Sequence, residues 1–223
     1  MIIQVKKITP PDLWREFAEM ASGKKCKMTW LDMLKTGHSP IREQRYFFTF
    51  REVPQFVCGH IIRHDKFANV SVHSKRVDKG GRDFRMECES LADILDTQCE
   101  NIAKGIIDAS IENIRETIGK ICTLPAIYDR YGAASFAFDT NAEEIINISR
   151  ARLCNAASPE TQRIWRQVLD LIEDIDPDLA KLCHRPCVWY GFCRERKPCG
   201  YMETAGYQTR RQQFKNLFNP KIK

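Results

Sequence analysis

Two spacings of apolar residues divide the chain into predicted strands and helices. Alternating or continuous runs of β-branched and aromatic residues predict strands at 2–8, 45–53 and 136–139, and a strand or an extended loop at 69–77. Helical spacing predicts helices at 13–20, 142–152 and 159–174, and one long helix or two over 90–122. The apolar positions of 54–64 fit a buried helix as well as a strand, and we favour the helix.

Several of the predicted helix starts carry a side chain suited to capping. Asp12 and Asn141 stand immediately before helical patterns, and Ser158 is followed by Pro159, which favours the first helical position. Asp176-Pro177 ends the helix that Ser158 begins, or starts the next short turn.

The composition is that of an ordinary globular protein. The 223 residues are 43% hydrophobic and 29% charged, which excludes disorder, collagen and coiled coil as descriptions of the whole chain. Such a length predicts one large domain, or one domain with an appendage. No apolar run approaches the roughly 18 residues of a membrane helix, and the N-terminus lacks a signal-peptide pattern, so we expect a soluble, cytoplasmic protein.

The charge balance is mildly basic. Thirty-five Lys and Arg against 29 Asp and Glu give a net charge of +6, which fits binding of phosphates but does not require a nucleic-acid partner. The chain has no glycine-rich phosphate loop, so any nucleotide or flavin must be held by side chains and helix ends.

Histidine and arginine side chains are concentrated in the first third of the chain. Four of the five histidines, His38, His60, His64 and His73, fall among several arginines. Imidazole and guanidinium together suit phosphate binding and proton transfer near neutral pH. A basic surface with hydrogen-bonded histidines is the plainer alternative.

Four of the ten cysteines cluster near the C-terminus, at Cys183, Cys187, Cys193 and Cys199. Four thiolates within 17 residues predict a zinc site or an iron–sulfur cluster, with His184 as a substitute ligand. No Cys-x-x-Cys pair of the zinc-ribbon type occurs, and free thiols in a packed loop or disulfides are the alternatives.

Several segments follow one another in an order that resembles a known family. They are GHSPIRE at 37–43, FTFR at 48–51, the segment 53–64 ending in Ile-Arg-His, Ser-Lys-Arg at 74–76, Asn-Ala at 141–142, RLCN at 152–155, Gln162 with Arg166, and the cysteine-bearing stretch 186–200. In this order they resemble the flavin-dependent thymidylate synthases (ThyX), over regions 38–76 and 141–200.

The resemblance implies a mixed α/β fold with a central sheet and long helices, assembled as a homotetramer with active sites between subunits. It divides the chain into a flavin and nucleotide domain at 1–182 and a cysteine-rich loop with a basic tail at 183–223. It implies an enzyme that binds FAD, uses NADPH, and transfers a one-carbon unit from methylenetetrahydrofolate to C5 of dUMP, giving dTMP.

The resemblance also assigns residues to roles. The flavin side of the site would hold His38, Arg63, His64 and Asn155. The nucleotide side would hold His60, Ser74, Arg76, Arg152 and Arg166, of which Ser74, Arg76 and Arg152 would act in catalysis.

Departures from the family pattern leave the substrate open. Asp65, Glu143 and Asp174 stand where basic residues are usual. The alternatives are therefore a relative that modifies another pyrimidine nucleotide, for example by hydroxymethylation, or a non-catalytic nucleic-acid or regulatory binding protein.

Overall fold

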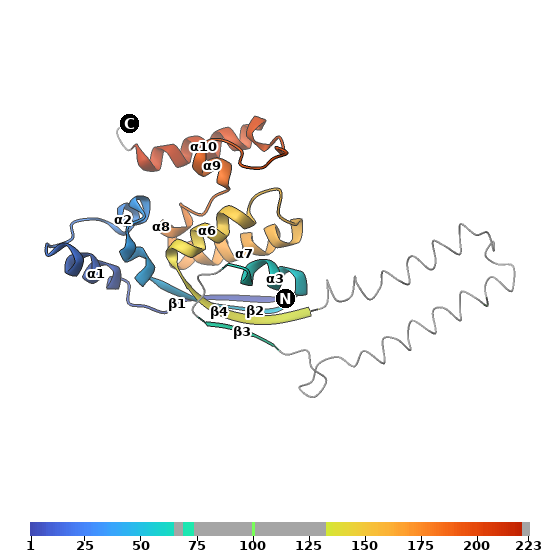
Figure 1. Cartoon of the computed structure of the whole chain (residues 1–223), viewed down its shortest axis with the longest axis horizontal. Helices are drawn as coiled ribbons and strands as arrows, with labels where there is room; N and C mark the ends of the chain where they lie inside the picture. Colours follow the sequence, from blue (N-terminus) through green and yellow to red (C-terminus); the bar gives the residue numbers. More distant parts are fainter. Residues whose placement is uncertain (65–68, 74–99, 101–132, 220–223) are drawn as a thin grey trace.

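The computed structural model describes residues 1–64, 69–73, 100 and 133–219 (Figure 1). Its elements in chain order are β1 (Ile2–Lys7), α1 (Leu13–Ser22), α2 (Trp30–Thr36), η1 (Ser39–Glu43), β2 (Arg45–Pro54), α3 (Gln55–Ile62), β3 (Asn69–Val72), β4 (Ala133–Asn141), α6 (Ala142–Arg152), α7 (Pro159–Ile175), α8 (Pro177–Ala180), α9 (Pro186–Tyr190), η3 (Tyr201–Glu203) and α10 (Ala205–Phe218).

The strands of the described residues form one antiparallel sheet in the order β1-β2-β4-β3. In the central pair, Phe48 lies opposite Phe138 and Phe50 lies opposite Phe136. The two pairs of rings stack with centroids 4.8 and 4.5 Å apart. Because a one-residue slip would turn these rings away from the core, the stacked pairs hold β2 and β4 in register.

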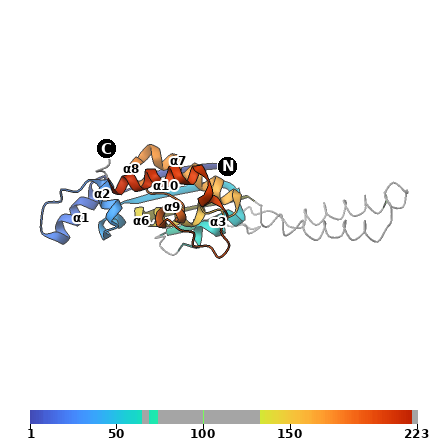
Figure 2. The same ribbon diagram turned by 90° about the horizontal axis from the view of Figure 1, so that it is seen from above.

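Helices cover one face of this sheet. Figure 1 shows α3, α6 and α7 above the strands, with α9 and α10 as a further layer over α6 and α7. The view from above places α1 and α2 at one end of the sheet and α3 at the other (Figure 2). The architecture is mixed α/β, as the sequence predicts.

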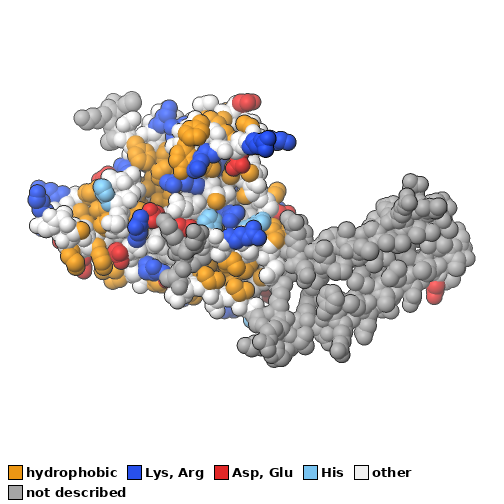
Figure 3. Space-filling model, in the orientation of Figure 1, with side chains coloured by type: hydrophobic (Ala, Val, Ile, Leu, Met, Phe, Trp, Pro, Cys, Tyr) orange, Lys and Arg blue, Asp and Glu red, His pale blue; other side chains and the backbone are white. Residues whose placement is uncertain are grey.

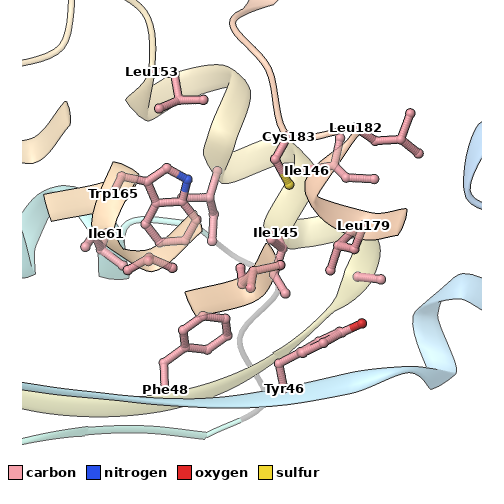
Figure 4. Close-up of a cluster of buried hydrophobic side chains, with 14 of the residues drawn as sticks. Tyr46, Phe48, Ile61, Ile145, Ile146, Leu153, Trp165, Leu179, Leu182 and Cys183 are labelled. Atoms are coloured by element: carbon pink, nitrogen blue, oxygen red, sulfur yellow. The ribbon is translucent and has the colours of Figure 1, made fainter. Parts of the chain in front are cut away.

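The core lies between the sheet and α6 and α7. Trp165, Phe48 and Ile145 are fully buried there, together with the other side chains drawn in Figure 4. The Trp165 Nε1 donates to the Ser149 hydroxyl at 2.9 Å, and that hydroxyl donates to the Ile145 carbonyl at 2.7 Å. The buried indole N–H is thus satisfied, and α7 is joined to α6.

Asp176, between α7 and α8, is a second buried connection. Its carboxylate accepts hydrogen bonds from the Tyr46 hydroxyl at 2.5 Å, from Trp30 Nε1 at 3.0 Å and from Lys7 Nζ at 2.8 Å. It also caps α8 by accepting from the Leu179 amide at 3.1 Å. One carboxylate therefore holds β1, β2, α2 and α8 together.

A bulge in β2 sets the position of α3. The pairing with β4 shifts between Phe50 and Val53, and Glu52 takes a left-handed backbone with φ of 57°. Val53 is buried again, and Pro54 both ends the strand and precedes the first helical residue. The chain therefore turns from the sheet into α3 with no intervening loop.

Most of the predicted elements are confirmed. The strands at 2–8, 45–53 and 136–139 are β1, β2 and part of β4, and the favoured helix at 54–64 is α3. The strand predicted at 69–77 is confirmed over 69–72 as β3, and the helices at 142–152 and 159–174 are α6 and α7. The helical pattern at 90–122 lies outside the described residues, apart from Glu100. The basic tail contains a helix, α10, which buries Tyr207 and Phe214.

Two predicted caps are confirmed and one is wrong. The side chains of Asn141 and Ser158 accept hydrogen bonds from backbone amides in the first turns of α6 and α7. Asp12 precedes α1 but makes no cap bond with its side chain, because its backbone (φ −106°, ψ 6°) is not extended as a capping residue requires. No helix of the described residues is long and apolar enough to cross a membrane.

Candidate active site

The C-terminal end of α3 lies against both ends of α6. Arg152, the last residue of α6, donates through Nη2 to the backbone carbonyl of His60. His64, just beyond α3, places its Nδ1 3.2 Å from Oε1 of Glu144 in the first turn of α6. These two contacts join the end of α3 to α6.

His60 also reaches the start of α7. Its Nδ1 lies 2.9 Å from the Thr161 hydroxyl, which lies 2.7 Å from the hydroxyl of Ser158, the residue that caps α7. The imidazole and the two hydroxyls form a continuous hydrogen-bonded row. This row fixes the His60 ring relative to the positive end of the α7 dipole.

The guanidinium of Arg152, at the end of α6, feels the charge of Arg63, just beyond α3. Burial lowers the pKa of Arg152, and the neighbouring charge of Arg63 lowers that pKa further. The Arg152 Nε is buried, with no hydrogen-bond partner in the described part of the chain. An anion that binds between two cations stabilises both, so this point favours a phosphate or carboxylate ligand.

The His64–Glu144 pair is largely buried. The two side chains are 16% and 5% exposed, and Glu144 also accepts from Asn147 Nδ2 at 3.2 Å. The carboxylate fixes the His64 ring through Nδ1. The opposite nitrogen, Nε2, is buried without a hydrogen-bond partner among the described residues, so this ring atom still lacks a polar contact.

Histidine and basic side chains are visible on the surface over α3. Figure 3 shows histidine and basic side chains gathered there, near the middle of the face it presents. Of the residues assigned by resemblance, the structure brings together His60, Arg63, His64 and Arg152.

The other assigned residues lie elsewhere or have other partners. His38 is exposed at the start of η1 and lines a cavity together with residues of α1. The Asn155 side chain donates to the Cys199 sulfur at 3.5 Å, and Arg166 donates to Gln162 Oε1 at 3.1 Å. Ser74 and Arg76 lie outside the described residues.

Two of the acidic residues that stand where the family pattern has basic ones lie outside the cluster of His60, Arg63, His64 and Arg152. Glu143 forms an ion pair with Arg42, its Oε2 2.8 Å from the Arg42 Nε. Asp174 is exposed, thirteen residues beyond Thr161 on α7, which corresponds to about 20 Å of helix. Asp65 lies outside the described residues.

Sequence reasoning did not find the partners that hold the two histidines. Thr161 and Glu144 each follow a capping residue by three positions, where the capping pattern already accounts for a polar side chain. Glu144 is a candidate capping-box residue by position, yet its carboxylate binds His64 and Asn147.

The structure does not bring the four predicted metal ligands together. Cys183 is completely buried, which raises its pKa to about 12, and its sulfur lies among apolar side chains (Figure 4). Cys187, Cys193 and Cys199 instead line a cavity that Cys154 completes. Among the described residues, no three Cys, His, Asp or Glu side chains are placed to hold one metal ion. The expected set that includes Cys183 is therefore not assembled.

No family model matches this chain, and no curated protein matches it. Solved structures do resemble it. A flavin-dependent thymidylate synthase ThyX from Helicobacter pylori, complexed with FAD and dUMP, is 18% identical with a TM-score of 0.55, over 83% of this chain and 100% of that one. A second ThyX structure from the same organism, also with FAD and dUMP, is 19% identical with a TM-score of 0.53, over 82% and 99%.

A UMP/dUMP methylase, PolB from Streptomyces cacaoi with 5-Br dUMP, is 14% identical over 81% of this chain and 94% of that one, with a TM-score of 0.48. At these identities the two H. pylori structures show the fold. The chain has a ThyX-like fold.

Proposed function

We propose that the protein is a flavin-dependent enzyme that transfers a one-carbon unit to C5 of dUMP or a closely related pyrimidine nucleotide. The observation that carries this proposal is the convergence of Arg63, His64 and Arg152 on a ThyX-like fold. Proteins of this fold from H. pylori bind FAD and dUMP, and the cluster offers the charge that both ligands require.

The residues present fit a flavin nucleotide. FAD carries two phosphates and a ring edge of hydrogen-bonding atoms, and the cluster supplies two guanidiniums and a buried, unpaired His64 Nε2. Arg63 would bind phosphate, and His64, held by Glu144, would hydrogen-bond the ring. When bound, the flavin supplies hydride; NADPH as its reductant and methylenetetrahydrofolate as the carbon donor stay predictions.

Arg152 is proposed to face the substrate nucleotide. Its hydrogen bond to the His60 carbonyl fixes one edge of the guanidinium, while its buried Nε has no hydrogen-bond partner among the described residues. A fixed cation beside a uracil carbonyl or a phosphate stabilises negative charge without reorganising during the reaction. Ser74, Arg76 and Arg166 remain proposed partners on the nucleotide side.

We also propose a homotetramer with sites shared between subunits, as the family resemblance implies. His38 would contribute from the start of η1. The first turn of α6 contacts η1 through the Arg42–Glu143 pair and contacts His64 through Glu144. Asn155, by contrast, is engaged with Cys199, and a flavin contact from it would require that bond to break.

The proposal is tested by a visible spectrum of the purified protein and by product analysis. We expect bound flavin and, with dUMP, methylenetetrahydrofolate and NADPH under anaerobic conditions, conversion of dUMP to dTMP detected by mass spectrometry. Parallel reactions with UMP and without folate serve as controls. A hydroxymethylated product would identify the related reaction. Flavin-loaded protein that neither binds nor alters dUMP or UMP would refute the proposal.

A further inference from the structure

We propose that the C-terminal part of the chain binds a single-stranded nucleic acid. The surface that would carry this binding, called here the tail surface, consists of Tyr190, Phe192, Arg194, Arg196 and Lys197, at the end of α9 and in the loop that follows it. These side chains are not members of the cluster of His60, Arg63, His64 and Arg152, and the inference does not depend on the proposed function.

The positive charge of the chain is concentrated in its C-terminal part. Residues 183–223 contain nine Lys and Arg against two Asp and Glu, whereas residues 1–182 contain 26 against 27. The net charge of +6 therefore comes from this part of the chain alone. Basic residues gathered in one segment, rather than spread over the whole sequence, favour a polyanionic partner.

Three of these cations follow one another in the loop between α9 and η3. Arg194, Arg196 and Lys197 are exposed, and none of them forms an ion pair with an acidic side chain in the part of the chain that the structure describes. Glu195, the acidic residue between them, accepts a hydrogen bond from the Cys154 thiol at 3.8 Å. The three cations can therefore attract phosphates from solution.

Two exposed aromatic rings adjoin these cations. Tyr190 and Phe192 are 39% and 57% exposed, and their ring centroids are 5.9 Å apart. Unpaired bases stack on exposed rings of this kind, largely without regard to sequence, while a basic surface follows the phosphates. An acidic protein would match the cations but would leave the rings uncovered, so the combination favours bases joined by phosphates.

The ring of Tyr190 also holds a cation at the surface. The guanidinium carbon of Arg194 lies 5.1 Å from the centroid of this ring. Contact with a ring face uses none of the five N–H donors of an arginine, so these donors stay available to phosphate oxygens. An aromatic ring and a phosphate-binding group are thus placed side by side, as neighbouring base and phosphate groups are in a strand.

Contacts with α10 fix α9 and hence the two rings. Arg211 donates through Nη1 to the Trp189 carbonyl at 3.0 Å, and the rings of Trp189 and Phe214 pack with centroids 4.8 Å apart. Figure 3 shows hydrophobic and basic side chains beside one another over these two helices. A surface that is ordered before binding loses less conformational entropy when a ligand arrives.

The test is fluorescence anisotropy of the full-length protein with a labelled strand of about twelve deoxyadenosines. Adenine is chosen because the proposed nucleotide site takes pyrimidines, so that site would not account for the signal. We expect a micromolar dissociation constant at about 50 mM salt, and binding weaker by about 5-fold or more at about 200 mM. A strand of equal length whose sugars carry no bases has the same phosphates and should bind about 5-fold more weakly or less.

Variants separate the rings from the cations. Phe192→Ala should weaken binding by about 5-fold or more, and Arg196→Ala should weaken it and reduce its dependence on salt. Both side chains are exposed, so neither change should unfold the protein. Phe17→Ala and Lys24→Ala are the matched controls, because these residues are exposed in the N-terminal part of the chain and should not affect binding.

Three results would overturn the proposal. One is no change in anisotropy at low salt with about 100 μM protein. Another is equal affinity for the strand without bases, which would leave only a general attraction between charges. The third is unchanged affinity in Phe192→Ala together with a smaller oligomer, since the rings would then form a contact between copies of the chain. Conversion of dUMP is measured in a separate reaction, so failure here leaves the proposed function to its own test.

Discussion

Arg152 and His60 are 92 residues apart in the sequence and are joined by a hydrogen bond from guanidinium to backbone carbonyl. The sheet makes this contact possible. β2 and β4 are antiparallel neighbours, and α3 follows the end of β2 while α6 turns back over the sheet after β4. The last turn of α6 therefore arrives beside α3. A cation from one half of the chain is thus fixed against a histidine from the other.

Replacing Arg152 with Ala should weaken nucleotide binding more than it weakens the fold. The change removes a cation from the proposed phosphate or carbonyl contact, and a hydrogen bond from a charged group is worth about 1.5–3 kcal/mol. We expect dUMP affinity, measured by calorimetry, to fall by about 10-fold or more. Arg210→Ala, on the exposed side of α10, is the control and should bind as the original protein does. Equal affinity in both variants would remove Arg152 from the site.

Replacing Glu144 with Gln should destabilise the protein and release His64. The carboxylate is buried between His64 and Asn147, and the amide places a donor where one of two acceptors stood. We expect the free energy of unfolding, measured in urea, to fall by about 1–3 kcal/mol, and flavin affinity to fall with it.

Glu143→Gln is the neighbouring control for Glu144. Its ion pair with Arg42 is exposed to solvent, and such pairs add little to stability. A larger loss of stability in Glu143→Gln than in Glu144→Gln would contradict the structural assignment.

Replacing Asp176 with Asn should destabilise the fold without a direct effect on the site. The buried carboxylate accepts from Lys7, Trp30 and Tyr46, and an amide would turn a donor toward these donors. We expect a loss of about 2–4 kcal/mol in the free energy of unfolding. Asp178→Asn removes only a surface pair with Lys181 and should leave the urea midpoint nearly unchanged.

Asp139 should contribute stability that is lost in acid. Burial alone would raise its pKa, but hydrogen bonds from Arg45 and Asn69 outweigh burial and lower it. A carboxyl with a lower pKa in the folded chain stabilises the fold above about pH 4 and loses that effect as pH falls through its folded pKa.

The variant Asp139→Asn tests this pH dependence. It should unfold more easily at pH 7, by about 1–3 kcal/mol, and show a shallower loss of stability below about pH 4. Asp12→Asn is the control, because the Asp12 side chain is 74% exposed and its contact with Arg15 is 3.7 Å long. If Asp139→Asn lost stability below about pH 4 as steeply as the original protein, the Arg45 and Asn69 contacts would not contribute to stability.

Local patterns in the sequence were sufficient to predict most of the helices and strands. The aromatic run at 45–53 predicts β2, and Asn141 and Ser158 mark the starts of α6 and α7, because capping and period depend on residues a few positions apart. The histidine and arginine types also pointed to anion binding. Asp12 is an exception even at this short range, because its backbone angles are not those of a capping residue.

Tertiary structure decided which of these side chains meet. The antiparallel pairing of β2 with β4 brings the helices that follow these strands together, so that Arg152 reaches the His60 carbonyl. Sequence spacing groups Cys183 with the later cysteines, whereas the fold buries Cys183 and brings Cys154 to their cavity. Residue types and periods are properties of the chain itself, but contacts across 30 to 90 residues depend on how the sheet and helices pack.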